Sequence, residues 1–138
     1  MDFEIDRRLL ADSHLLFRRN RISYLLHANA EVLWLILVPH TNETEFYRLP
    51  PRMQKILCSE MNRLSNHLRA QFDCDKINLA TIGNVVEQMH IHIVARRRDD
   101  AFWPDVVWGK PILRRHPDEM VERMQRLVRD RTWGQTAS

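Results

Sequence analysis

Hydrophobic and polar residues alternate with two different periods along this chain, which predicts strands in some segments and helices in others. Three segments in the first third of the chain are predicted to be strands: Ser13 to Phe17, Ile22 to His27 and Val32 to Val38. Residues 18–21 form the turn between the first two, and a short helix is expected over residues 3–10. The third strand is apolar on both faces, so we expect it at the centre of a sheet that is covered on both sides.

A stripe of apolar residues predicts a long helix from Pro50 to about Phe72. The stripe comprises Met53, Ile56, Leu57, Met61, Leu64 and Leu68, a spacing that places them on one side of a helix. Pro50 and Pro51 suit its first turn, where a missing backbone N–H costs nothing. A C-terminal helix is expected over residues 117–131, with Asp118 and Glu119 near its positively polarised start.

Two further strands are predicted after the long helix, from Lys76 to Ile82 and from Gln88 to Val94. Gly83 and Asn84 form the connection between them, and a glycine there suits a turn with positive φ. It also suits a close approach of backbone N–H groups to an anion, and the two roles are compatible. The order of strands and helices indicates an α+β fold in a single domain of residues 1–138.

The last predicted strand carries the most informative pattern in the chain. Gln88, His90 and His92 alternate with apolar residues, so in a strand these three polar side chains share one face. Buried imidazoles and amides must all find hydrogen-bond partners, which makes such a row unsuitable for a core. The row therefore indicates a functional site.

Chance and metal binding remain alternatives to a catalytic role for the row. The chain has seven His, so two of them at positions i and i+2 can arise by chance. A His-x-His pair can also supply two zinc ligands, with a third from His27, His40 or a carboxylate. However, Gln88 is a poor zinc ligand, and the sequence has no Cys-x-x-Cys or His-Glu-x-x-His motif. We therefore expect no metal at this site.

The residues around the row resemble the histidine triad family, whose signature is His-φ-His-φ-His-φ-φ with φ apolar. Here Gln88 takes the place of the first His, while His90 and His92 match the second and third. Other residues with counterparts in the family are Gly83-Asn84, Asn78, Arg96-Arg97 and Trp103-Pro104. The resemblance covers roughly residues 10–108. It implies a five-stranded antiparallel sheet with the long helix packed on it, and a twofold homodimer.

The resemblance also implies a nucleotide hydrolase or nucleotidyl transferase. His90 is then the expected nucleophile, because a neutral imidazole can attack phosphorus and form a covalent nucleotidyl-His intermediate. His92 would steady the transferring phosphoryl group. The residues expected to contact the substrate are Gly83, Asn84, Asn29, Asn78, Arg96 and Trp103.

Gln88 is the departure from the family pattern that affects the chemistry. A carboxamide donates hydrogen bonds but cannot exchange a proton near neutral pH. A phosphate leaving group needs little protonation, whereas an amine needs a proton. We therefore hypothesise that dinucleoside polyphosphates such as diadenosine tetraphosphate, or related nucleotide esters, suit the site better than phosphoramidates. A nucleotide-binding sensor or adaptor with negligible turnover is the alternative.

The nucleoside end of the site is harder to assign from sequence. Asn29 is the nearest match to a family residue that meets the ribose, and Leu26 and Ile36 fit either a base slot or plain core. A family His lies close to the position of His40. Trp103 and Trp108 fit a functional role, closing over the site or reaching the site of a partner subunit, and equally a structural one, packing of a long Pro-containing segment.

Charge and composition narrow the class of protein. The net charge is +3 and eighteen of the twenty-one basic residues are Arg, which suits phosphate but also follows from genome base composition. No basic stripe is broad enough for a duplex, so no nucleic-acid partner is expected. No apolar run could span a bilayer, the N-terminus is acidic, and the two Cys form no framework, so we expect a cytoplasmic protein without membrane contact. No cofactor is predicted, apart from a divalent cation that a polyphosphate substrate can carry.

Overall fold

The computed structural model describes residues 2–130. Its elements are α1 (Arg7–Ala11), β1 (Ser13–Arg19), β2 (Ile22–His27), β3 (Leu33–Pro39), a 3-10 turn η1 (Phe46–Arg48), α2 (Pro51–Gln71), β4 (Lys76–Ala80), β5 (Ile91–Arg96) and α3 (Asp118–Arg129). The strands form one antiparallel sheet in the order β1-β2-β3-β5-β4, so β1 and β4 are its edges. The predicted α+β fold and five-stranded sheet are confirmed.

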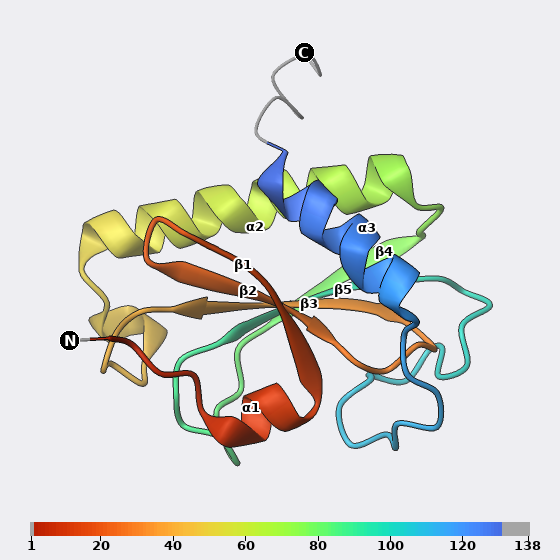
Figure 1. The fold of residues 1–138 in the computed structure, drawn as a ribbon, viewed down its shortest axis with the longest axis horizontal. Coiled ribbons are helices and arrows are strands. Elements are labelled where there is room, and N and C mark those ends of the chain that lie inside the picture. Colours follow the sequence, from red (N-terminus) through yellow and green to blue (C-terminus); the bar gives the residue numbers. More distant parts are fainter. Residues whose placement is uncertain (1, 131–138) are drawn as a thin grey trace.

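The sheet is covered by different elements on its two faces. Figure 1 shows α2 and α3 on one side, and α1 with the segment between β5 and α3 on the other. The helical side holds the larger part of the core, in which Leu57, Leu64 and Leu68 of α2 pack against strand residues such as Leu35 and Ile93. Central strand β3 is therefore buried on both faces, as its apolar sequence predicted.

The face opposite the long helix carries the candidate site. Side chains alternate along a strand, so the residues next to the core leucines point to this second face. Here Ile36 and Val94 pack with Ile5 and Leu9 from the N-terminal part of the chain, and with Val107 from the segment after β5. The cover on this face is loop-like rather than a long helix, which leaves room for polar side chains.

Several predicted boundaries differ from the observed ones by one to four residues. The first helix starts at Arg7 rather than residue 3, because the Asp6 side chain accepts a hydrogen bond from the backbone N–H of Arg8 and so caps the helix there. The fourth strand ends at Ala80 rather than Ile82, and the fifth begins at Ile91 rather than Gln88. The neighbouring strand β3 ends at Pro39, which has no N–H to extend the ladder toward Gln88.

Other predicted features match the structure. Gly83 has a φ of 71° in the connection between β4 and β5, as its position predicted. Helix α2 begins with Pro51 in its first turn, and α3 spans all but the ends of the predicted C-terminal helix. Residue 131, the predicted end of that helix, lies outside the described residues. Within residues 2–130, none of the helices combines the length and the apolar composition that crossing a bilayer demands.

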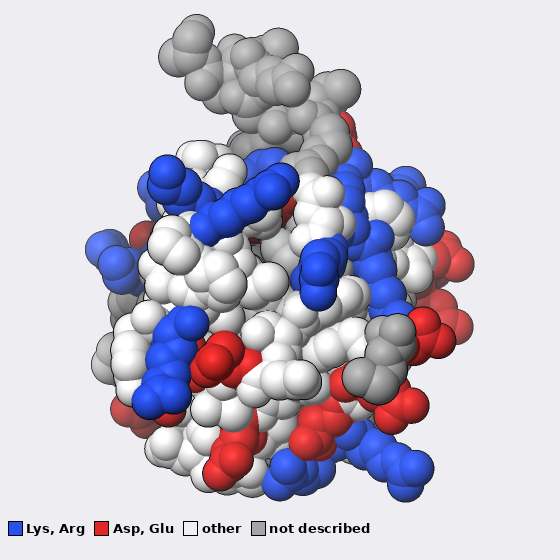
Figure 2. All heavy atoms as spheres, turned by 90° about the vertical axis from the view of Figure 1, so that its left-hand side faces the viewer, with Lys and Arg blue, Asp and Glu red and all other residues white. Residues whose placement is uncertain are grey.

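Charged side chains of both signs share the surface near the N-terminus. Figure 2 shows the side of the molecule that is on the left in Figure 1, where basic groups dominate the upper half and acidic groups lie in the lower half, some of them next to basic ones.

Candidate active site

His90 and His92 lie together on the loop-covered face of the sheet. His92 is on β5 and His90 directly precedes that strand, and their exposed fractions are only 5% and 6%. The two ring centroids are 4.8 Å apart and the rings meet edge to face, at 78°. Two of the three predicted catalytic side chains are thus brought into contact.

The ring orientation of His90 is set by a backbone carbonyl. Its Nδ1 atom lies 2.6 Å from the carbonyl oxygen of Gln88. A carbonyl oxygen can only accept, so Nδ1 carries the hydrogen and donates it. In a neutral ring the other nitrogen, Nε2, then keeps its lone pair. This is the tautomer that a nucleophilic His requires.

The ring orientation of His92 is set by Trp34 on β3. The indole Nε1–H of Trp34 donates a 2.9 Å hydrogen bond to Nδ1 of His92. An indole can only donate, so Nδ1 accepts and the hydrogen of the neutral ring sits on Nε2. Burial, followed by the neighbouring rings of His90 and His27, lowers the pKa of His92 from 6.5 to about 3. His92 is therefore a neutral hydrogen-bond donor at physiological pH.

A third imidazole, that of half-buried His27 at the end of β2, continues the row. It stacks on Trp34 with a centroid distance of 3.8 Å and an angle of 9°. The backbone N–H of Asn29 donates to its Nδ1 at 3.1 Å, which again leaves the hydrogen on Nε2. Burial is the main reason that the pKa of His27 falls from 6.5 to about 4. The rings of His90, His92, Trp34 and His27 thus form a chain of contacts from β5 across β3 to β2.

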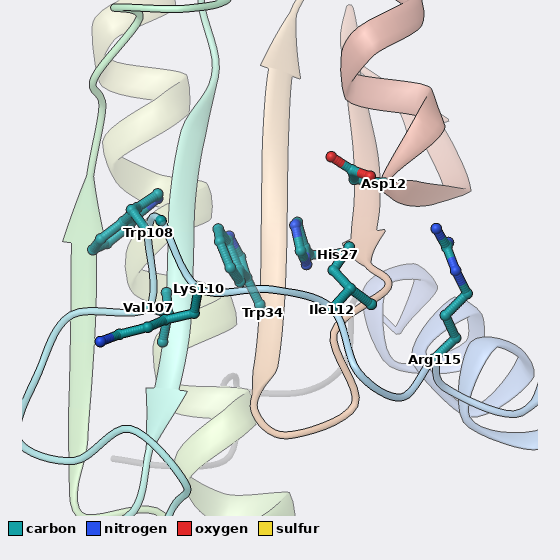
Figure 3. A pocket seen from close by; sticks show the side chains of 9 residues that line it. Asp12, His27, Trp34, Val107, Trp108, Lys110, Ile112 and Arg115 are labelled. Carbon is teal, nitrogen blue, oxygen red and sulfur yellow. The ribbon is translucent and has the colours of Figure 1, made fainter.

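A hollow of about 470 Å³ opens at the His27 end of this row. Its lining residues are Asp12, His27, Trp34, Val107, Trp108, Gly109, Lys110, Ile112 and Arg115. Figure 3 shows the Trp108, Trp34 and His27 rings side by side, with Lys110 pointing away from His27. Lys110 is paired with Asp105 at 3.2 Å. The volume is within the range of small-molecule sites, and three aromatic rings form part of its wall.

Trp108 closes this part of the face. Its ring meets Trp34 edge to face at 5.8 Å and His92 at 5.3 Å. Its indole N–H is buried and has no partner among the described residues. Trp108 thus lies next to both His92 and the hollow, and it also packs against the core on this face of the sheet.

Gln88 does not share a face with the two imidazoles, contrary to the strand prediction. It lies before the start of β5, and its side chain turns to the N-terminal part of the chain. There its Oε1 accepts from the backbone N–H of Asp6 at 2.8 Å, and its Nε2 donates to the carbonyl of Glu4 at 2.9 Å. The residue contributes to the site through its backbone carbonyl, which holds His90.

Asn78 and Trp103 form a separate cluster around the buried Arg96. Arg96 is 1% exposed and is paired with Asp100 through two hydrogen bonds, of 2.8 and 3.1 Å. It also donates to Asn78 Oδ1 at 3.0 Å, and its guanidinium lies 5.5 Å from the centroid of the Trp103 ring. Arg96 is almost fully buried and three of its N–H donors are bonded within the protein, so it does not present an accessible group for the predicted phosphate contact.

The remaining predicted residues lie around the site rather than in it. Asn29 is fully buried and its Oδ1 accepts from the backbone of Glu31, so it reaches the row only through its backbone contact with His27. Gly83 and Asn84 are in the loop that leads from β4 to His90. His40 lies further along the same face, where Ser23 is 2.8 Å from its Nε2 and Phe3 stacks on its ring. Within residues 2–130, no group of three or more His, Cys, Asp or Glu is arranged to hold a metal ion.

Comparison with known proteins decides the family. The model of the HIT domain matches residues 8–99. The chain belongs to the histidine triad (HIT) family. Similar solved structures include histidine triad proteins from Sinorhizobium meliloti 1021 and Bradyrhizobium japonicum, which are 31% and 34% identical to this chain. Both have a TM-score of 0.85 and cover 92% of this chain, and the chain covers 95% and 96% of theirs.

Two more relatives extend the comparison. A histidine triad protein from Marinobacter aquaeolei VT8 is 34% identical, with a TM-score of 0.83 over 91% of this chain and 93% of its own. Among curated proteins, adenylylsulfatase HINT3 of Arabidopsis thaliana is 26% identical over 98 residues, which are 67% of this chain and 47% of that protein. The chain therefore spans about half the length of this curated relative.

Sequence reasoning missed two members of the row in this histidine triad protein, Trp34 and His27. The pattern around Trp34 indicates a uniformly apolar segment, but an indole carries one donor that needs a partner when buried. The alternation of side chains along the strands could have indicated both residues, because Trp34 and the end of β2 lie on the face of the sheet that also holds His92. For His27 the sequence suggested only the role of a metal ligand.

Proposed function

We propose that this histidine triad protein is a nucleotide hydrolase or nucleotidyl transferase in which Nε2 of His90 attacks an α-phosphate. The observation that carries the proposal is the 2.6 Å contact between Nδ1 of His90 and the carbonyl of Gln88. It directs the lone pair of the neutral ring to Nε2, the nitrogen that faces away from the backbone. Family membership supports the reaction class.

The reaction divides into two displacements at phosphorus. In the first, the Nε2 lone pair forms a P–N bond and the leaving group departs with the electrons of the broken P–O bond. In the second, water forms a new P–O bond and gives its proton to solvent, and the electrons of the breaking P–N bond return to Nε2 of His90. The hydrogen stays on Nδ1 and is donated to the Gln88 carbonyl throughout, and this contact stabilises the positive charge that the ring acquires.

His92 suits the role of a neutral donor to the transferring group. Its Nε2 carries a hydrogen because Trp34 occupies Nδ1, and its lowered pKa keeps the ring uncharged. A fixed N–H beside developing negative charge stabilises a transition state without rearrangement. The ring lies in contact with His90, which is where that charge would develop.

The surroundings of Gln88 favour substrates with an anionic leaving group. Both polar atoms of its carboxamide are bonded to the backbone of residues 4 and 6, and a carboxamide has no proton to give. Phosphate and sulfate leave as stable anions, whereas an amine needs protonation. The substrates that fit are therefore anhydrides of a nucleoside monophosphate: dinucleoside polyphosphates such as diadenosine tetraphosphate, or adenylyl sulfate, the compound in the name of the Arabidopsis relative.

The hollow next to His27 is the proposed position of the nucleoside. It adjoins the ring row that leads to His90, and aromatic rings from Trp34, Trp108 and His27 line it. His27 carries its ring hydrogen on Nε2, so it can act as a neutral donor there. When His27 is neutral, the charged residues among those that line the hollow are Asp12, Lys110 and Arg115.

A homodimer is part of the proposal. Strand β4 is an edge strand, and large apolar side chains on it and in the following loop are exposed: Leu79 by 50%, Ile82 by 44% and Val85 by 78%. An uncovered apolar edge favours pairing with a second strand. A symmetric dimer across β4 would cover these side chains.

A substrate panel tests the proposed activity. Wild type and His90→Asn are assayed with diadenosine tetraphosphate, adenylyl sulfate and adenosine phosphoramidate, with release of AMP as the readout. We expect wild type to cleave the two anhydrides faster than the phosphoramidate, and the variant to cleave none of them. Nucleotide binding without AMP release in wild type would instead identify a sensor and overturn the proposal.

A further inference from the structure

The Gln88 carboxamide is held by two backbone groups that are 82 and 84 positions away in the sequence. The carbonyl of Glu4 and the N–H of Asp6 point to the same side of an extended segment, so one carboxamide can satisfy both. Its Oε1 accepts at 2.8 Å and its Nε2 donates at 2.9 Å. Gln88 thus takes the place that a neighbouring strand would have beside this segment.

The partner of Gln88 is a docked part of the chain, residues 3–9, here called the N-terminal segment. Ile5 and Leu9 are 6% and 8% exposed and pack on the site face of the sheet. Phe3 stacks on His40 with centroids 4.4 Å apart. A third bond links the segment to the same loop as Gln88, because Arg8 Nη1 donates to the carbonyl of Val85 at 2.9 Å. The segment therefore offers Gln88 a fixed attachment.

Gln88 needs such an attachment because no strand ladder holds it. Strand β5 begins at Ile91, so Gln88 and His90 lie in the loop that precedes it. The nearest tether on the other side is Thr81, whose hydroxyl donates to the carbonyl of His90 at 2.9 Å. Without the carboxamide bonds, the backbone at residue 88 would be held only through its neighbours, by the Arg8–Val85 bond on one side and the Thr81–His90 bond on the other.

The backbone at Gln88 is also the group that orients the nucleophile. Its carbonyl accepts the Nδ1 hydrogen of His90. The side chain of one residue thus anchors the carbonyl whose position fixes the tautomer and direction of the reacting ring.

We infer that Gln88 is a positioning residue: its carboxamide, held by the N-terminal segment, fixes the carbonyl that keeps Nε2 of His90 free for attack. The inference rests on the proposed function in one respect, that Nε2 is the reacting atom. The residue that replaces the first His of the triad therefore acts on the reaction through His90, and it neither donates a proton nor contacts the leaving group.

A matched pair of substitutions at Asp6 tests the link without touching the triad. Asp6→Pro and Asp6→Ala both remove the carboxylate that pairs with Arg8, but only proline also removes the N–H that donates to Gln88. The φ of −54° at this position suits proline. Comparing the two variants isolates the effect of that single hydrogen bond on His90.

Two readouts are combined. The nitrogen chemical shifts of the His90 ring report its tautomer, and steady-state kinetics on diadenosine tetraphosphate separate kcat from KM. We expect Asp6→Pro, relative to Asp6→Ala, to mix the His90 tautomers and to lower kcat about tenfold with KM unchanged, as a displaced catalytic group does. Gln88→Met should do the same, and Gln88→Glu, which keeps the acceptor for Asp6, should restore part of the rate.

The outcomes separate this inference from the proposed activity. Equal tautomer populations and equal kcat in the two Asp6 variants, with an active wild type, would overturn the positioning role alone. A tautomer change in Asp6→Pro, in a wild-type protein that cleaves no nucleotide, would support the positioning role and overturn the proposed function.

Discussion

The indole N–H of Trp34 points at Nδ1 of His92, 2.9 Å away, and determines which nitrogen of that imidazole carries a hydrogen. Trp34 is 5% exposed and His92 equally so, which means that water does not compete for this bond. A neighbouring strand thus sets the chemical form of the last triad residue.

Replacing Trp34 with Phe should therefore lower catalysis more than its loss of volume explains. The change leaves Nδ1 of His92 without a donor, frees the ring to adopt the other tautomer, and costs about 1–3 kcal/mol of stability for the unpaired buried atom. We expect kcat for diadenosine tetraphosphate to fall by an order of magnitude or more.

Trp108→Phe is the matched control, because the indole N–H of Trp108 has no partner among residues 2–130. It removes similar ring area next to the same hollow and should raise KM with little change in kcat. If Trp34→Phe retained the wild-type kcat, the donor role of His92 would have to be abandoned.

Two neutral imidazoles, buried His92 and partly buried His27, make stability sensitive to mild acid. The pKa of His92 is lowered to about 3 and that of His27 to about 4, both mainly by burial. Below pH 6.5 the unfolded chain binds protons that the folded state refuses, so the free energy of unfolding falls as pH falls from 6.5 toward 4. Each group contributes a slope of up to about 1.4 kcal/mol per pH unit in that window.

Urea unfolding at a series of pH values between 7 and 4.5 measures this slope. Gln cannot titrate. His27→Gln should therefore reduce the slope of the unfolding free energy against pH by up to about 1.4 kcal/mol per pH unit, the contribution of one proton. A profile that is the same in the variant and in wild type would show that the folded protein accepts the proton on His27 without cost.

Much of the fold was predictable because its signals are local. The stripe from Met53 to Leu68 specified α2, and the doubly apolar segment before Pro39 specified the central strand. Gly83 marked a turn with positive φ. The placing of His90 and His92 next to each other on one face was predicted from the alternation of polar and apolar residues and from the family signature. Each of these features depends on residues that are close in sequence.

The parts that were missed depend on contacts between distant residues. The alternation expected of a strand placed the Gln88 side chain beside the imidazoles. In the structure its carboxamide is bound by backbone groups of residues 4 and 6, and no sequence pattern near residue 88 predicts that contact. Arg96 was expected at a phosphate because its charge was visible and its partner Asp100 was not assigned to it. Trp34 has an apolar ring, so its role in orienting His92 emerged only from the sheet register.

Arg96 should prove structural when it is substituted. Its pairing with Asp100 is buried, with side-chain exposures of 2% and 5%, so removing one partner leaves an uncompensated charge. We expect Arg96→Met to cost about 3–5 kcal/mol of stability. Under conditions where the variant is folded, kcat and KM should remain near the wild-type values. A folded variant with a greatly raised KM would restore Arg96 to the substrate site.

The proposed dimer predicts a specific effect at the β4 edge. Leu79→Lys places a charge on a strand that would pair with its copy, whereas Leu113→Lys places one at a site that is 78% exposed and outside the sheet. Sedimentation velocity should find a dimer for wild type and for Leu113→Lys, and a monomer for Leu79→Lys. Unchanged sedimentation of the Leu79 variant would remove β4 from the interface.

The central claim is that His90 becomes covalently bonded to phosphorus, and direct capture of that bond tests it. Wild-type protein is mixed with excess diadenosine tetraphosphate, quenched within milliseconds under alkaline denaturing conditions, and analysed by intact mass spectrometry and peptide mapping. The account predicts an added adenylyl group on the peptide that contains His90, and none in His90→Asn. AMP release at the wild-type rate with no adduct at any quench time, or an adduct on another residue, would contradict it.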